Sequence, residues 1–308
     1  MTLTADGRLV IGRAQASGPV IARSHTAPIQ IETSLFSDAA IELTGVSAEL
    51  SNGATLAAAT DLTITADNVT LGSGAIAAAG MDADGNLATS GDLAITADAL
   101  TATGAQLAAA GDATLIADAV TLNQTGGAEA VSVLGNLSIE TAALAANDAT
   151  LSVLGDVDIT NAGALALNGG TLAAGGDVTV NAARLDASTA IEAGGSVDLT
   201  TQSGRMDLTG DIDTAEAMLG TGFSMHFPGN VTMTGADAVS LTICDEPIPG
   251  GISLEDKGIT NNDKEGGDAT DGGVEVAVRV DNTQVELLVQ LHVRATCGAH
   301  GTDDDDIA

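Results

Sequence analysis

One short segment recurs along most of this chain and limits the folds that the chain can adopt. The residues DLTITA at 61–66 return in related form farther along, and a Gly usually precedes the opening Asp, Asn or Ser. The related segments are 92–97 DLAITA, 112–117 DATLIA, 136–140 NLSIE, 156–160 DVDIT, 177–181 DVTVN, 196–200 SVDLT and 230–234 NVTMT. Successive starting residues from Asp92 to Ser196 lie 19 to 24 residues apart. A repeat of about 20 residues predicts a stack of similar units.

The pattern inside each unit predicts short strands rather than helices. In 176–195, GDVTVNAARLDASTAIEAGG, Val178 and Val180 alternate with polar residues, and Leu185 and Ile191 recur where the next short strands should fall. Alternation with a period of two over three to five residues is typical of strands. Dense Thr, Gly, Asn and Asp disfavour helix. We therefore expect an all-β chain.

Stacking is needed because one unit cannot be stable alone. Ordering about 20 residues costs on the order of 30 kcal/mol, while each small apolar side chain returns about 1 to 2 kcal/mol on burial. Stacked units share backbone hydrogen bonds with the units on both sides and enclose a continuous apolar column. The chain is 44% apolar but has no Trp, no Tyr and three Phe, so this column must be narrow and aliphatic.

The segments 91–111 and 175–195 resemble the haemagglutinin repeats of filamentous haemagglutinin and related adhesins exported by two-partner secretion. The resemblance covers roughly 45–240. It implies a right-handed parallel β-helix, a secreted or cell-surface location, and an adhesive or structural role. It carries over no binding residues, because the repeats contain none that are diagnostic, and the secretion domain of that family is not recognisable in this chain.

The sequence divides into four predicted parts. Residues 1–44 are expected to form an N-terminal cap or irregular first rungs, 45–244 the parallel β-solenoid, 245–273 an acidic Gly-rich linker or loop, and 274–308 a β-hairpin with an acidic tail. Within the solenoid, 72–90 lengthens one unit to about 31 residues and is expected to protrude as a loop.

The predicted hairpin joins 274–280 VEVAVRV to 285–293 VELLVQLHV across a four-residue connection. One of its faces is apolar throughout and is too large for an isolated hairpin to bury. We expect this face to cap the last rung or to associate with another molecule. It comprises Val274, Val276, Val278, Val280, Val285, Leu287, Val289, Leu291 and Val293.

The charge of the chain excludes two classes of partner. Lys and Arg total 9 against 42 Asp and Glu, a formal net charge of -33, and no Lys or Arg lies between Arg23 and Arg184. Binding to nucleic acid and adhesion to anionic lipid both need clustered cations. No stretch of about 18 uncharged apolar residues predicts a membrane-spanning helix. We therefore expect neither nucleic-acid binding nor membrane insertion.

Two sets of residues are candidate binding or cross-linking sites. Asp82, Asp84 and Asn86 place oxygen ligands at alternate positions beside a Gly, as at the start of a calcium loop, although position 93 is Leu where such a loop has Glu. An ordinary acidic turn is the alternative. Cys244 and Cys297 can form one disulfide or remain two buried thiols. No other metal or cofactor is expected.

Two further functions were weighed on particular residues. Asp156 with Asp158, or Asp211 with Asp213, has the spacing of a glycosidase carboxylate pair, but the sequence lacks the aromatic and basic residues that hold sugars. Two columns of hydroxyl side chains are expected on one face, which suggests ice binding, but acidic residues and Asn181 interrupt them. The predicted columns are Thr63, Ser138, Thr179 and Thr232, and Thr65, Thr96, Thr160, Thr200 and Thr234.

The preferred interpretation is a non-catalytic, extracellular or cell-surface solenoid that acts as a stalk, an adhesin or a matrix or filament subunit. Its expected partners are further copies of itself or a surface receptor or glycan. A carbohydrate-active β-helix enzyme is the first alternative, and a virus-like or intracellular assembly subunit is the second.

Overall fold

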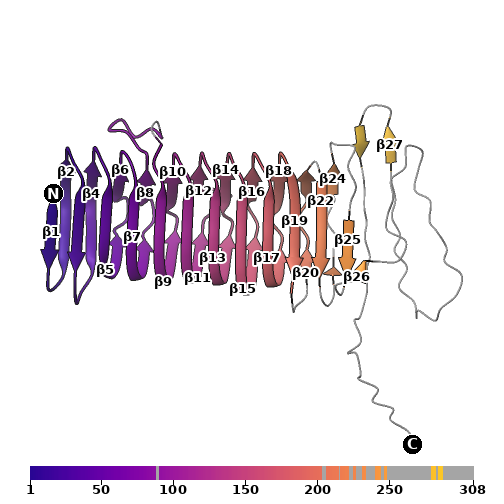
Figure 1. Cartoon of the computed structure of the whole chain (residues 1–308), viewed down its shortest axis with the longest axis horizontal. Helices are drawn as coiled ribbons and strands as arrows, with labels where there is room; N and C mark the ends of the chain where they lie inside the picture. Colours follow the sequence, from indigo (N-terminus) through magenta and orange to yellow (C-terminus); the bar gives the residue numbers. More distant parts are fainter. Residues whose placement is uncertain are drawn as a thin grey trace, which may run out of the picture.

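The chain forms one elongated parallel β-solenoid of about 10 turns, with successive turns about 21 residues apart (Figure 1). The structure is a computed structural model that describes residues 1–87, 90–202 and 206–214, followed by the backbone of seven further strands. The described residues contain strands and turns but no helix, so none of them forms a helix able to cross a membrane.

Each turn presents three faces, which we define on the turn formed by β7 (Leu62–Leu71) and β8 (Ile76–Ala79). Residues 62–66 form the first face, 69–71 the second face, and β8 the third face. In the middle of the solenoid one long, bent strand forms the first two faces. The long strands are β5 (Ile41–Leu50), β7, β9 (Leu93–Thr103), β11 (Ala113–Asn123), β13 (Leu137–Asn147), β15 (Val157–Asn168) and β17 (Val178–Ala187).

A short strand forms the third face of each of these turns. The short strands are β6 (Thr55–Ala58), β8, β10 (Gln106–Ala109), β12 (Glu129–Val133), β14 (Thr150–Val153), β16 (Thr171–Ala174) and β18 (Ala190–Ala193). The next strands are β19 (Ser196–Thr201), β20 (Met206–Leu208) and β21 (Ile212–Thr214). The strands described by backbone alone are β22 (Glu216–Thr221), β23 (Met225–His226), β24 (Val231–Met233), β25 (Ser240–Ile243), β26 (Glu246–Pro247), β27 (Arg279–Asp281) and β28 (Gln284–Glu286).

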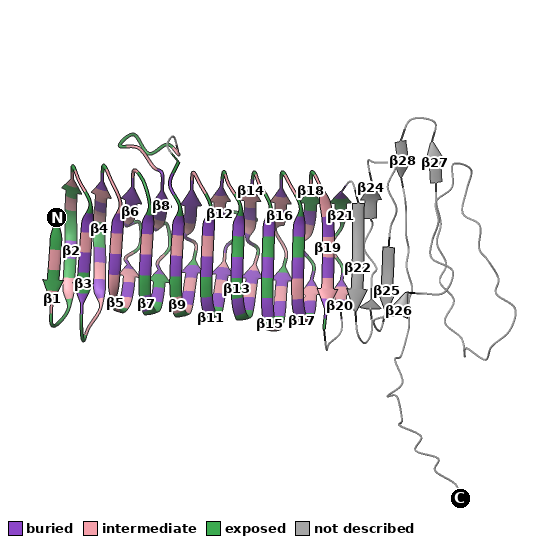
Figure 2. Ribbon diagram, in the orientation of Figure 1, coloured by how far each residue is buried: buried purple, intermediate pink, exposed green. Residues whose placement is uncertain are grey.

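The parallel register of the first face confirms the repeat. Leu62 pairs with Leu93, Leu93 with Ala113 and Ala113 with Leu137, and the series continues through Val157 and Val178 to Val197. Alternate side chains of every strand point inward and are buried, while their neighbours face solvent (Figure 2). The core is a single column of Ala, Val, Ile and Leu, with one Met, Met206, near its end. This is the narrow aliphatic core that the composition predicts.

Residues 1–44 are the first two turns of the same solenoid. Strand β1 (Thr2–Ala5) pairs in parallel with β3 (Val20–Ser24), and β2 (Leu9–Ala16) pairs in parallel with β4 (Ile29–Ser37). The only irregularity in these pairings is a shift in register between Ile11 and Arg13. Of the two predicted alternatives, the structure thus shows rungs, which extend the solenoid to the first residues.

The segment 230–234 does not occupy the position predicted for it. Thr232 pairs with Asp213 on the third face, not with the column of Thr179 on the first face. The first face continues instead through Ala217, which pairs with Val197, and then through β25. The alternation in NVTMT is shared by all three faces, so similarity to DLTITA alone assigned the wrong one.

The long unit contains an insertion of about ten residues rather than a loop spanning all of 72–90. Residues 72–79 form a normal turn and β8, and the insertion follows them, closed by an antiparallel bridge between Met81 and Leu87. Both of these side chains pack back on the outer side of the third face. The alanines beneath them, Ala57, Ala78 and Ala108, are at most 2% exposed. The insertion therefore protrudes and also covers part of this face (Figure 1).

The predicted hairpin is present in its central part. Arg279 pairs antiparallel with Glu286, and Asp281 with Gln284, so the connection consists of the two residues 282–283. The side chains of the apolar face of this hairpin, from Val274 to Val293, lie outside the described residues. Whether this face caps the solenoid or binds another molecule stays a prediction.

Candidate functional site

A ladder of side-chain oxygens follows the corner that precedes the first face. At each step, one Oδ1 atom accepts a hydrogen bond from the backbone N–H of the equivalent residue in the next turn. The donor to acceptor distances are 3.1 Å from Asp92 to Asp61, 2.9 Å from Asp112 to Asp92, 2.7 Å from Asn136 to Asp112, 2.9 Å from Asp156 to Asn136, 2.9 Å from Asp177 to Asp156 and 2.7 Å from Ser196 to Asp177. The recurrent Gly-Asp of the sequence is therefore a structural element of each turn.

The conserved spacing of this ladder explains the Gly that comes before each Asp. At Gly111, Gly135, Gly155 and Gly176, an added Cβ would overlap with the Oδ1 atom of the ladder residue in the preceding turn. Only a residue without a side chain leaves room for that oxygen. The ladder residues are exposed, and their carboxylates lie on adjacent turns about 4.8 Å apart.

The stability of the solenoid should rise with salt. Residues 32–183 hold 18 acidic residues and no Lys or Arg, so like charges face each other along the stack. Because the Debye length falls from about 30 Å at 0.01 M to about 8 Å at 0.15 M, added NaCl screens this repulsion. We expect the melting temperature to increase between these concentrations. Asp92→Asn keeps an oxygen for Asp112 but removes one charge, so its melting temperature should depend less on salt. A melting temperature that falls with NaCl would contradict this electrostatic interpretation.

A second ladder, which the sequence analysis missed, lies at the end of the second face. The Asn147 amide donates to Asn123 Oδ1 at 2.6 Å, and the Asn168 amide donates to Asn147 Oδ1 at 2.9 Å. The three Asn residues pair in the register of β11, β13 and β15. Their spacing of 24 and 21 residues follows the repeat and is the signal that could have identified them. Both ladders hold the turns in register and leave no unpaired group for chemistry.

The predicted hydroxyl columns are confirmed for most of their residues. Thr63, Ser138 and Thr179 lie in one column of the first face, and Thr65, Thr96, Thr160 and Thr200 lie in the adjacent column. Thr232 belongs to the third face, as described above, and Thr234 lies outside the described residues. Within these columns, Glu140 and Asp158 are directly exposed on neighbouring turns. The face is therefore mixed hydroxyl, acidic and apolar, not a uniform hydroxyl plane.

The candidate calcium ligands lie in the insertion, where one carboxylate closes the loop. Asp82 Oδ1 accepts the backbone N–H groups of Asp84 and Asn86, both at 2.9 Å, and the Asp82 N–H donates to the Asn86 carbonyl at 2.9 Å. These hydrogen bonds, chiefly that from the Asn86 backbone, lower the pKa of Asp82. Within the described residues, no group of three or more His, Cys, Asp or Glu side chains is placed to hold a metal ion. The calcium site stays a prediction, and Cys244 and Cys297 lie outside the described residues.

Acidification should open the insertion. Because the folded loop lowers the pKa of Asp82, the ionised carboxylate stabilises the closed loop above its ordinary pKa, and this stabilisation is lost as the pH falls through the lowered value. We expect faster amide hydrogen exchange at Asp84 and Asn86, after correction for intrinsic rates, when the pH drops below the usual carboxyl range. In Asp82→Asn the amide oxygen accepts the same bonds without titrating. Equal pH dependence in this variant would assign the opening to another group.

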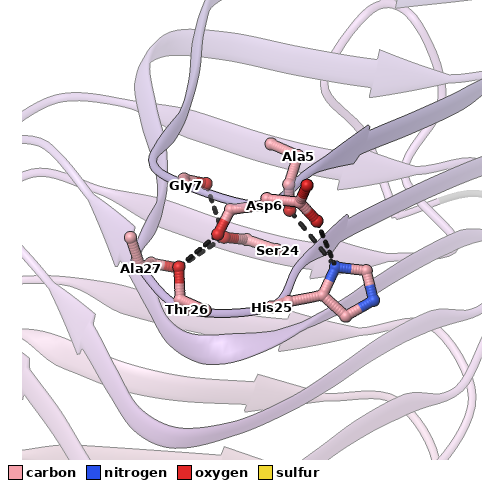
Figure 3. A network of polar contacts seen from close by, with 7 residues as sticks. All are labelled: Ala5, Asp6, Gly7, Ser24, His25, Thr26 and Ala27. Atoms are coloured by element: carbon pink, nitrogen blue, oxygen red, sulfur yellow. Dashed lines mark hydrogen bonds and ion pairs between the residues drawn. The ribbon is translucent and has the colours of Figure 1, made fainter.

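Ser, His and Asp side chains meet in the described residues at the corner between the first two turns (Figure 3). His25 Nδ1 lies 3.7 Å from Asp6 Oδ1 and 3.4 Å from the Ala5 carbonyl. The buried Ser24 hydroxyl instead lies 2.8 Å from the Gly7 carbonyl and 2.6 Å from the Ala27 carbonyl. Figure 3 shows that no contact joins Ser24 to His25. This corner therefore fastens the first turn to the second and does not present a nucleophile to a base.

Comparisons with protein-family models, with curated proteins and with solved structures find no match to this chain. The fold and the surface features described above define its class on their own. The chain is a parallel β-solenoid with polar ladders at two of its corners.

Proposed function

We propose that this chain is a non-catalytic structural or adhesive rod that acts outside the cell or at its surface, as a stalk, an adhesin or a matrix or filament subunit. The observation that carries the proposal is the continuous backbone pairing from β1 to β25. About 10 turns at about 4.8 Å give a stiff body roughly 50 Å long. Such a body separates its two ends by a fixed distance and offers a repeating surface, which suits a spacer or an adhesive array.

The use of the polar residues supports the same proposal. The side chains of the Asp and Asn ladders bond to adjacent turns, so they hold the rod together rather than face a substrate. The residue candidates for sugar hydrolysis are divided in the same way. Asp156 accepts the Asp177 backbone N–H at 2.9 Å, whereas Asp158 lies on the outer first face beside Thr160. The resemblance to haemagglutinin repeats agrees with an adhesive role.

A polysaccharide assay tests the proposal against the enzyme alternative. The full chain is incubated with a panel of acidic and neutral polysaccharides, and new reducing ends and unsaturated products are measured. We expect no product above that of a heat-denatured control. Turnover that Asp158→Asn or Asp198→Asn abolishes, without a change in melting temperature, would replace the structural role with a catalytic one.

A binding assay on the same panel tests the adhesive branch. The folded chain is immobilised and retention of glycans and of intact cells is measured. Retention that depends on the native fold supports an adhesin, whereas a folded rod that retains neither supports the stalk or filament subunit. Detection of the native protein only inside the producing cells would overturn the extracellular location.

A further inference from the structure

The first turn has an open strand edge in the described part of the chain. Strands β1 and β2 form the start of the stack, and each pairs on one side only, with β3 and with β4. The Leu9 N–H donates to the Pro28 carbonyl at 3.0 Å, on the β4 side. Because the backbone groups of successive strand residues point to opposite sides, the N–H and carbonyl of Val10 point to the open side.

The apolar core is also open at this end. Leu3 and Leu9 are only partly buried, whereas the residues that pair one position beyond Leu3 and directly with Leu9, Ala22 and Ile29, are 0% and 1% exposed. Val10 is 43% exposed. Another turn placed on this end would bury these side chains and pair the free backbone groups.

The charge at this end differs from that of the rest of the chain. Residues 1–31 hold Arg8, Arg13 and Arg23 against a single acidic residue, Asp6. Residues 206–308 hold 20 acidic residues against four Lys and Arg. Two first turns would bring cations together, whereas a first turn and the C-terminal third of another copy have opposite charge. Opposite charge favours a head-to-tail arrangement over a head-to-head one.

The far end of the stack differs from the first turn in its backbone as well. Strand β25 pairs in parallel with β22 on one side and antiparallel with β26 on the other. Strands β27 and β28 form the antiparallel hairpin farther along the chain. The C-terminal third thus contains strands outside the regular rungs, which are the kind of element that can add to an open edge.

We propose that the open edge of the first turn binds the acidic C-terminal third of a second copy of this chain. The contact joins two different surfaces, so repeating it produces a linear filament rather than a closed dimer. This inference rests on the proposed structural role and specifies how the rods assemble. The edge contributes the β1 and β2 backbone, the ends of the core column, and the positive charge of Arg8 and Arg13.

The test measures assembly of the full chain by sedimentation velocity and electron microscopy over a wide range of protein concentration at about 0.15 M salt. We expect mass to grow with concentration and the particles to lengthen without widening. Val10→Pro removes an open-edge N–H and leaves the bonds to β4 in place, so it should weaken assembly by about tenfold or more. Circular dichroism and thermal melting verify that this variant is folded.

A charge pair provides a matched control. Arg13→Glu and Arg184→Glu each change the net charge by the same amount, but Arg13 is exposed in the first turn and Arg184 lies in β17 beside Asp186. Assembly should weaken in Arg13→Glu and remain unchanged in Arg184→Glu. A wild-type chain that stays monomeric at every concentration, or equal effects of the two substitutions, would overturn the inference. Polysaccharide turnover would instead remove the structural role, so the two failures can be distinguished.

Discussion

Replacing Ile139 by Ala is expected to lower the free energy of unfolding by about 2 to 5 kcal/mol. Ile139 is 0% exposed and lies in the core column between Leu115 and Ile159 of the adjacent turns. No aromatic side chain lies among the buried residues of the described part, so the neighbours of the cavity are small and branched and can fill it only in part. Urea unfolding followed by circular dichroism measures the loss.

The control for this prediction is the neighbouring residue. Ser138→Ala removes a hydroxyl from the exposed side of the same strand and should change the free energy of unfolding by less than about 0.5 kcal/mol. Similar losses for the two variants would mean that inward and outward positions do not alternate along β13. The predicted architecture of the solenoid would then be wrong at its basic unit.

The substitution Gly170→Ala should be the most damaging single methyl addition at a turn. Gly170 has a φ of +72°, which costs a residue with a Cβ about 1 to 2 kcal/mol. An added Cβ would also overlap with the carbonyl of Ala149 in the preceding turn, so the two turns would have to separate. Forced repacking costs about 1 to 3 kcal/mol more. We expect a total loss of about 2 to 5 kcal/mol in urea unfolding.

Gly127 separates these two contributions. Its φ is +71°, but the nearest atom to an added Cβ is Thr150 Oγ1 at 4.0 Å. Gly127→Ala should therefore show the backbone cost alone, about 1 to 2 kcal/mol. If Gly170→Ala cost no more than Gly127→Ala, the close approach of adjacent turns at Ala149 would be refuted.

The repeat made most of the fold predictable from the sequence. Segments that begin at Asp92, Asp112, Asn136, Asp156 and Asp177 lie above one another, as their spacing predicts, because each must pair with its neighbours to bury its apolar side. The lack of bulky aromatics correctly predicted a narrow core. The right-handed sense of the solenoid stays a prediction from the resemblance and from the usual handedness of parallel crossovers.

Other features depend on packing that the sequence pattern does not encode. All three faces use the same alternation, so the face of Thr232 could not be read from its segment. The covering of Ala78 by Met81 and Leu87 depends on how the insertion folds back, and short apolar residues in a loop do not reveal their contacts. The corner at Ser24 joins residues of two turns, and only the register of β1 on β3 brings them together.

Distances between spin labels along the outer first face test the stacked architecture most directly. Glu42, Ser138 and Asp198 lie in one column, four turns and seven turns apart along the registered pairs. At about 4.8 Å a turn, Cα separations of about 19 Å from Glu42 to Ser138 and about 34 Å from Glu42 to Asp198 are expected. Double electron–electron resonance should report two narrow distributions that differ by about 14 Å. Equal distances, or broad distributions without this increment, would contradict the solenoid.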